Sequence, residues 1–345
     1  MDIAFFISDH GYGHLTRNLE IARELLNRGH RVSVITGKQH GAVAAAYLEG
    51  RAAIMACHTD AGLILKPGTL EVDAAATERA VRSHLAEWDS LIAGSPDADL
   101  YAVDIAPWAL LAAKRKGIPS CILTNFTWIE QYEAFLPEEL LEEYRKAFRS
   151  RDYAFYYDLA SEPCRMVLGE GSDIGFAARA INRARVKEIR SRHSRPLVFI
   201  SVGMSNDGIQ EAIDVGDLPY DFVTTFSVNL RGNNVTALPS DVPNTQDYVA
   251  AADYCIAKAG WSTVSEIMLA GVPFAALNRP DVAEDTLTIR EIERRGCGIG
   301  IDVRDLRNMG GVMERLRLLK RYEPYPNSSH AIAAMLESLG QKKRW

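Results

Sequence analysis

The sequence Lys258-Ala259-Gly260-Trp261-Ser262-Thr263-Val264-Ser265-Glu266 follows an apolar run at 254–257 and decides how this half of the chain folds. An apolar strand, a turn of small residues and a helix start form a strand–turn–helix unit. The first turn of such a helix has unpaired backbone N–H donors and binds anions such as phosphate. Glu266, one turn further along, can accept two hydrogen bonds from a vicinal diol such as a ribose. The stretch therefore predicts a nucleotide site.

Short apolar strands alternate with helices on both sides of this stretch. The second half repeats the pattern from 197–201 to 298–301, and the first half shows it from 3–8 onward. Such alternation is typical of parallel sheets that are covered by helices on both faces. A chain of 345 residues is long enough for two such domains. The predicted fold class is α/β, with two doubly wound Rossmann-like domains that face each other across a cleft.

A polar, basic stretch separates the two halves. Residues 182–195 contain six Arg or Lys residues, and Pro196 opens a new apolar strand. We expect an interdomain linker here, whose charges can equally belong to a solvated helix face. The expected domains are 1–190 on the acceptor side and 195–325 on the nucleotide-sugar side. A C-terminal helix at 326–345 can pack back on the first domain.

Composition narrows the possible partners. The net charge is −6 and there is no long Lys/Arg block, which argues against nucleic acid. The five cysteines are odd in number and widely spaced, and we interpret Cys121 and Cys255 as core residues rather than disulfide or metal ligands. No run of 18 apolar residues and no leader segment is seen, so we expect a cytoplasmic protein without a transmembrane segment. Peripheral contact with a membrane stays open.

The loop Ser8-Asp9-His10-Gly11-Tyr12-Gly13-His14 follows the first strand. The dinucleotide-binding fingerprint needs a further glycine where Thr16 stands, so a dehydrogenase is not predicted. The glycines allow the backbone to approach a ligand closely. A neutral imidazole at His14 can act as a general base, and a packing role at the start of a helix is the alternative.

Asp104 ends the strand at 100–103, on the same edge of the sheet as the first loop. If Asp104 reaches one nitrogen of His14, it fixes the tautomer and stabilises the imidazolium, so that the other nitrogen can accept a proton. The alternative role for Asp104 is to cap the helix that begins near Pro107, and the two roles are compatible. His14 and Asp104 are therefore the catalytic candidates.

These residues resemble a known superfamily. Gly11-Tyr12-Gly13-His14-Leu15-Thr16-Arg17, with Leu25-Leu26-Asn27-Arg28-Gly29-His30-Arg31-Val32, resembles the opening of the GT-B glycosyltransferases. It is particularly similar to the Gly-x-Gly-His-x-x-Arg variant in the glycosyltransferase-like N-terminal half of L-arabinokinases. Thr124-Asn125-Phe126-Thr127-Trp128 is similar to a Thr-Asn-Phe-Ser-Trp segment of the same group. The sequence contains no counterpart of their galactokinase-like half, so the resemblance implies no kinase activity.

The second half resembles the nucleotide domain of the lipid-linked N-acetylglucosamine transferase of peptidoglycan synthesis and of the UDP-glycosyltransferases. The resemblance places Ala259–Glu266 at their small-residue turn and ribose-binding glutamate. Glu284 and Asp285 fall where those families hold the hydroxyls of the donor sugar. In the UDP-glycosyltransferases a histidine of the first loop is the base and an aspartate is its partner, and His14 and Asp104 match those positions.

The resemblance implies an inverting glycosyl transfer from a nucleotide diphosphate sugar, with UDP favoured, to an unknown acceptor hydroxyl, without metal or other cofactor. Lys258 replaces a His or Arg of the related sequences, and Glu284 makes the sugar-binding pair wholly acidic, which leaves the donor sugar open. The expected donor-site residues are Gly13, Ser201, Gly203, Ser205, Gln246, Lys258, Gly260, Trp261, Ser262, Thr263, Glu266, Glu284 and Asp285, and those on the acceptor side are Tyr12, Arg17, Asn125 and Trp128.

Two other functions stay open at this point. Nucleotide-sugar hydrolases of nonulosonate synthesis share the Gly-x-Gly-His-x-x-Arg opening and activate water instead of an acceptor. The extra helices at 127–150 favour a transferase. A non-catalytic nucleotide-sugar-binding protein would bind without turnover, and the presence of both His14 and Asp104 argues against it.

Overall fold

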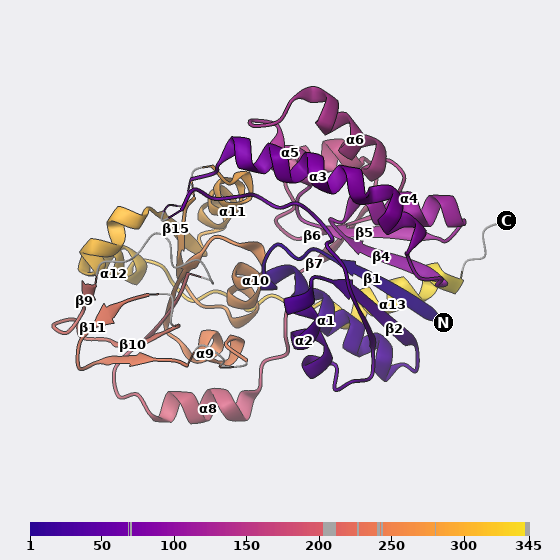
Figure 1. The fold of residues 1–345 in the computed structure, drawn as a ribbon. Helices are drawn as coiled ribbons and strands as arrows, with labels where there is room; N and C mark the ends of the chain where they lie inside the picture. Colours follow the sequence, from indigo (N-terminus) through magenta and orange to yellow (C-terminus); the bar gives the residue numbers. More distant parts are fainter. Residues whose placement is uncertain are drawn as a thin grey trace. The chain divides into compact units, whose positions relative to one another are not determined.

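A computed structural model describes residues 1–67, 69, 71–202, 212–225, 228–239, 242, 244–279 and 281–341 (Figure 1). The chain divides into two compact units. The first unit consists of Met1–Ile64, Val72–Ala178 and Asn327–Trp345, and the second of Leu65–Glu71 and Arg179–Pro326. No helix in the described part of the chain is long and apolar enough to cross a membrane.

The first unit is built on a parallel sheet of seven strands in the order β3-β2-β1-β4-β5-β6-β7. The central strands β4 and β5 are buried along their whole length, because helices cover both faces of the sheet. The strands are β1 Asp2–Ile7, β2 Arg31–Thr36, β3 Ala53–Ala56, β4 Leu100–Asp104, β5 Ser120–Thr124, β6 Tyr153–Tyr157 and β7 Ser172–Gly175, and the helices are α1 Tyr12–Asn27, α2 Lys38–Tyr47, α3 Ala74–Ala93, α4 Pro107–Lys116, α5 Trp128–Tyr132, α6 Glu138–Phe148, α7 Glu162–Leu168 and α13 Ser329–Gln341.

The second unit has a parallel sheet of six strands in the order β12-β10-β8-β13-β14-β15 and a small pair, β9 and β11. Parallel, doubly wound sheets in both units confirm the α/β fold class expected from the sequence. The strands are β8 Leu197–Ser201, β9 Ile213–Asp214, β10 Asp221–Thr224, β11 Leu230–Arg231, β12 Val235–Ala237, β13 Tyr254–Lys258, β14 Phe274–Leu277 and β15 Gly298–Ile301, and the helices are α8 Arg183–Ser191, α9 Gln246–Ala251, α10 Trp261–Ala270, α11 Ala283–Arg294, the 3-10 helix η1 Val303–Asn308 and α12 Met309–Arg317.

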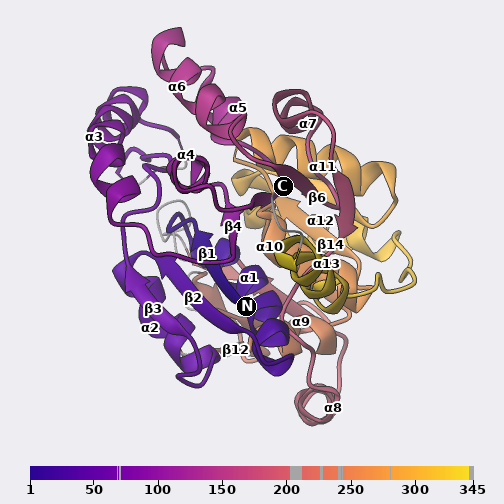
Figure 2. The same cartoon turned by 90° about the vertical axis from the view of Figure 1, so that its right-hand side faces the viewer.

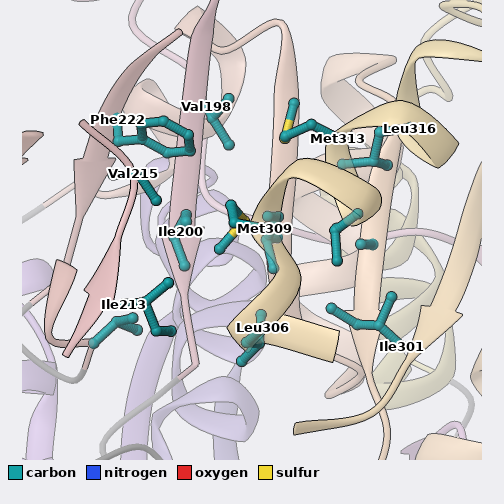
Figure 3. Close-up of a cluster of buried hydrophobic side chains, with 14 of the residues drawn as sticks. Val198, Ile200, Ile213, Val215, Phe222, Ile301, Leu306, Met309, Met313 and Leu316 are labelled. Carbon is teal, nitrogen blue, oxygen red and sulfur yellow. The ribbon is translucent and has the colours of Figure 1, made fainter. Parts of the chain in front are cut away.

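One face of the second sheet packs against η1 and α12 (Figure 3). Ile200 of β8 and Phe222 of β10 lie on the sheet side of this core, and Met309, Met313 and Leu316 of α12 cover them. Burial of these apolar side chains is the main driving force for the fold of this unit.

The basic stretch that we expected to be a linker forms helix α8 in the second unit. The side chain of Asn182 caps this helix, and its backbone N–H donates to Asp247 Oδ1 over 2.8 Å. Arg190 Nη2 donates to Asp253 Oδ1 over 3.1 Å. A charged surface helix and a linker have the same polar composition, and only the contacts to the second unit distinguish them.

The C-terminal segment belongs to the first unit. Asn327 Nδ2 donates to the carbonyl oxygen of Ala178 over 2.7 Å, and Ser328 N donates to Phe176 O over 2.8 Å. Helix α13 then packs beside α1, as Figure 2 shows. The C-terminal stretch of this unit is therefore joined to the rest of it by hydrogen bonds to the backbone of residues 176 and 178 and by a helix–helix contact.

We expect Leu336→Ala in α13 to lower the free energy of unfolding by about 2–5 kcal/mol, because the side chain of Leu336 is fully buried. Urea denaturation followed by circular dichroism measures this loss. Leu318→Ala is the matched control, since Leu318 is 83% exposed and its truncation should change stability by less than about 0.5 kcal/mol. Equal losses in the two variants would contradict the placement of α13 in the core of the first unit.

Candidate functional site

The first group of candidate residues lies where the strand order of the first sheet reverses, between β1 and β4. Asp104 is the last residue of β4 and pairs in register with Ile7, the last residue of β1. The first turn of α1 carries His14. In doubly wound sheets, ligands bind beyond the carboxyl ends of the strands at such a point. His14 and Asp104 therefore lie at the edge where these folds bind ligands.

Gly11 forms the N-cap of α1 with φ 92° and ψ 153°. L side chains rarely adopt this backbone conformation, so glycine is needed here for conformation rather than for space. Gly13, which we expected at the donor site, lies half-buried in the first turn of α1 in the first unit. The turn at Gly11 directs the chain into the helix that presents His14.

His14 and Asp104 form a buried hydrogen-bonded pair, with Nδ1 of the imidazole 2.8 Å from Oδ1 of the carboxylate. Asp104 is 1% exposed. An ionised carboxylate only accepts hydrogen bonds, so in the tautomer whose Nδ1 donates to Asp104 the nitrogen that can accept a proton is Nε2. This is the geometry of a base held by a carboxylate.

Arg17 and Asn18 complete the coordination of this carboxylate. Arg17 donates from Nε to Asp104 Oδ2 over 2.9 Å and from Nη2 to Oδ1 over 2.8 Å, and Asn18 Nδ2 donates to Oδ2. Burial raises the pKa of Asp104, but Arg17 and His14 outweigh this effect and lower the pKa to about 2. With this lowered pKa the carboxylate of Asp104 is ionised at neutral pH. Arg17 is itself held by Asn125, whose Oδ1 accepts from Nη1 over 2.8 Å.

Ile105, directly after Asp104, has a left-handed backbone with φ 49° and is fully buried. A β-branched residue rarely adopts this conformation, which costs about 1–3 kcal/mol and persists where the surroundings impose it. The bend it creates precedes Ala106, the N-cap of α4, and Pro107, its first residue. Asp104 therefore does not occupy the N-cap of this helix, which was the alternative role for its carboxylate.

The residues expected on the acceptor side are mostly buried. Arg17 is 1% exposed and belongs to the Asp104 network, and Asn125 is buried beside it. Trp128 is fully buried and stacks on Tyr132, with ring centroids 5.2 Å apart. Tyr12 differs from them, because its half-buried ring packs on His40 and keeps part of its surface open. Of the four residues expected on the acceptor side, Tyr12 therefore has the most exposed surface.

In the second unit, α10 begins at Trp261 with Gly260 as its N-cap and without a side-chain cap. Ser262 and Thr263 lie half-buried in its first turn, whereas Trp261 is buried. Lys258 folds over this turn, since its Cε lies 3.3 Å from the position that a Cβ on Gly260 would take. A cation thus lies at the positive end of the helix, where anions bind.

Arg279 lies beside Lys258 and was not identified from the sequence. It donates from Nε to Asp285 Oδ2 over 2.7 Å and from Nη2 to Oδ1 over 2.6 Å. Arg279, together with burial, lowers the pKa of Lys258 to about 8, although Asp285 and Glu284 oppose this shift. Lys258 and Arg279 repel each other at the start of this helix, and a bound anion would offset this repulsion.

The two acidic residues expected to bind the donor sugar have different surroundings. Asp285 is fully buried and both of its oxygens accept from Arg279, so its visible role is to hold that guanidinium. Glu284 is half-buried, and its Oε1 accepts from the backbone N–H of Trp261 over 3.3 Å. Glu284 therefore lies at the start of α10.

One oxygen of Glu266 accepts a hydrogen bond from Arg179, which was not identified from the sequence. Its Oε1 accepts from Arg179 Nε over 2.8 Å, and Arg179 Nη2 donates to Thr245 Oγ1 over 3.0 Å. Glu266 is 7% exposed. Gln246 is also buried, and its Nε2 donates to the carbonyl of Ala180. An ionised carboxylate has about four acceptor positions on its two oxygens, so the ion pair with Arg179 leaves Glu266 able to accept further hydrogen bonds.

The remaining candidates lie in the loop after β8. Ser201 ends this strand and is half-buried, and its hydroxyl lies 3.5 Å from that of Thr225. Gly203 and Ser205 lie outside the described residues. Within the described part of the chain, no cluster of three or more His, Cys, Asp or Glu side chains could hold a metal ion.

Several solved structures that are similar to this chain are glycosyltransferases. A glycosyltransferase of kitacinnamycin is 17% identical with a TM-score of 0.64, over 98% of both chains. UGT89C1 of Arabidopsis thaliana, complexed with UDP, is 11% identical with a TM-score of 0.64, over 98% of this chain and 99% of that one. UGT2 of Phytolacca americana, complexed with UDP-2-fluoro-glucose and pterostilbene, is 12% identical with a TM-score of 0.62, over 99% of this chain and all of the other.

The fold is that of the GT-B glycosyltransferases. This confirms the fold that the resemblance in the sequence implied, and identities this low show a shared fold only. No family model matches the sequence. L-arabinokinase of Arabidopsis thaliana is 27% identical over 321 residues, which are 88% of this chain. The chain spans 30% of that protein's length.

The lowered pKa of Lys258 predicts a pH-dependent stability. In the unfolded chain this lysine has its usual pKa near 10.5, so between pH 8 and pH 10.5 the unfolded state holds more protons than the folded state. Stability should therefore gain up to about 3 kcal/mol from this group as pH rises through that window.

The measurement is urea denaturation of the wild type and of Lys258→Met at pH 7, 8, 9 and 10. If Lys258→Met has a higher free energy of unfolding than the wild type at pH 7, this difference should shrink as pH rises. A difference that stays constant across these four pH values would show that Lys258 is not perturbed in the folded protein.

Proposed function

We propose that the chain is a metal-independent inverting glycosyltransferase that uses a nucleotide diphosphate sugar, with UDP as the favoured nucleotide, and an acceptor hydroxyl of unknown structure. The observation that carries the proposal is the buried His14–Asp104 pair at the strand-order reversal of the first sheet. The similar solved structures are glycosyltransferases, two of them with UDP or a UDP-sugar analogue bound, which supports the reaction class and the nucleotide.

The donor diphosphate is assigned to the start of α10. Its first-turn N–H groups, Lys258 and Arg279 supply positive charge without a metal ion. Glu266 Oε2 is the proposed acceptor for a ribose hydroxyl, and Glu284 for a hydroxyl of the donor sugar. Asp285 supports this site indirectly, because it holds Arg279.

In the proposed step a proton moves from the acceptor hydroxyl to His14, and the glycosyl group moves from the diphosphate to the acceptor oxygen. His14 Nε2 takes the proton of the acceptor hydroxyl while that oxygen attacks the anomeric carbon. The bond from the anomeric carbon to the β-phosphate oxygen breaks, and its electron pair leaves with the nucleoside diphosphate. Attack from the face opposite the leaving group inverts the configuration. Lys258, Arg279 and the start of α10 stabilise the negative charge of the leaving group.

Hydrolysis of a nucleotide sugar is the second candidate, and one observation favours it. Three of the four residues expected on the acceptor side are buried, which leaves less surface for a large acceptor. In that reaction water replaces the acceptor and the products are a free sugar and the nucleoside diphosphate. Release of sugar from UDP-sugars at the same rate with and without acceptors would select the hydrolase.

His14→Ala should lower turnover by about 10²–10⁴-fold, because proton transfer by a positioned side chain contributes that much. The affinity for UDP, measured by calorimetry, should stay unchanged, since the proposed donor residues belong to the second unit. His330→Ala is the control, because His330 is an exposed histidine of α13. Loss of UDP affinity in His14→Ala would move His14 to the donor site, and unchanged turnover would remove it as the base.

The double variant Arg279→Met/Asp285→Asn should weaken UDP binding by about tenfold or more, because a charge-assisted contact to the phosphates is lost. Changing both residues avoids a buried unpaired carboxylate. Binding of uridine, which has no phosphate, should change little. Arg290→Met on the exposed side of α11 is the control. Parallel losses for UDP and uridine would place Arg279 away from the phosphates.

A further inference from the structure

Arg17 is a charged side chain that the proposed mechanism does not yet use. Its guanidinium is 1% exposed, and it lies one helical turn after His14, on the same face of α1. Nη2 lies 2.8 Å from Asp104 Oδ1 and 2.9 Å from His14 Nδ1. Nη2 of Arg17 therefore contacts both His14, the proposed general base, and its partner Asp104.

The charges of this network differ from those of a base held by a free carboxylate. In such a pair the carboxylate stabilises the imidazolium because no other cation shares it. Here Asp104 accepts from Arg17 at both oxygens, and this ion pair is neutral before His14 takes a proton. Protonation of His14 would place a second positive charge next to a buried guanidinium.

The position of Arg17 is fixed from several sides. Asn125 Oδ1 accepts from Nη1 over 2.8 Å, and the guanidinium carbon lies 4.8 Å from the centroid of the Tyr157 ring. The planar guanidinium of Arg17 therefore cannot rotate away from Asp104 without losing several of these contacts. Arg17 therefore fixes the orientation of the carboxylate that in turn fixes His14.

We propose that Arg17 is a positioning residue that neutralises Asp104 and thereby makes His14 a base that releases its proton readily after the transfer step. The proposal rests on the proposed role of His14 as the base. Within the described residues, Asp104 on β4 and Arg17 on α1 contact the imidazole, and His40 on α2 lies close enough to interact with it electrostatically. Of these, the two that carry charge at neutral pH act on His14 in opposite directions.

The test is an NMR titration of the His14 ring in the whole protein, assigned with His14→Gln, without any ligand. In Arg17→Met the carboxylate is no longer shared, so His14 should protonate at a pH about one to three units higher than in the wild type. Asp104→Asn should shift protonation to lower pH. Arg17→Lys, which keeps the charge, should titrate close to the wild type.

Arg23→Met, on the same helix and outside this network, is the matched control and should leave the titration of His14 in place. If Arg17→Met does not fold, the pair Asp104→Asn and Arg17→Met/Asp104→Asn measures the same effect, and the double variant should protonate at the higher pH. A purely structural role would lower the melting temperature of the Arg17 variants and leave the titration unchanged, which would overturn the proposal. Because the titration needs no turnover, failure of the proposed transferase activity gives a separate result.

Discussion

The carboxylate of Asp104 is the constraint on which the candidate site of the first unit depends. A buried carboxylate is stable only when its oxygens accept hydrogen bonds from several donors. Donors from His14, Arg17 and Asn18 reach it from one face of α1, at spacings of three and four residues. The spacing of the Gly-x-Gly-His-x-x-Arg segment therefore has a physical reason, since it places the donors of one helix around one buried charge.

Both units balance buried charge within one small group of residues. In the first unit Arg17 balances Asp104, so that the imidazole lies in a neutral network. In the second unit Arg279 is paired with Asp285, and Lys258 and Glu284 lie together at the start of α10. Under the proposed function, the first network serves transient proton transfer, and the two cations of the second stabilise an anionic leaving group.

The sequence predicted the parallel sheets and the His14–Asp104 pair, because apolar periodicity marks strands and residues at the carboxyl ends of parallel strands meet. It placed Arg17 among ligand contacts, since charge alone does not show whether a side chain is buried. Arg179, which donates to Glu266, was not identified because it belongs to none of the sequence motifs that were recognised. Asn18 could have been found from its place four residues after His14. The basic stretch around α8 was ambiguous, since solvated helices and linkers share a composition.

The chain leaves the first unit at Ala178 and returns to it at Asn327, and these two residues are joined by a hydrogen bond of 2.7 Å. Residues 179–326, which make up the second unit except for Leu65–Glu71, are thus inserted between two points that almost touch. A segment whose two ends lie close together can be exchanged easily, because its replacement does not require the backbone of the host domain to move. Under the proposed function this inserted segment carries the donor-site residues, so its exchange at this junction would leave His14 and Asp104 in place and change the nucleotide sugar that is used.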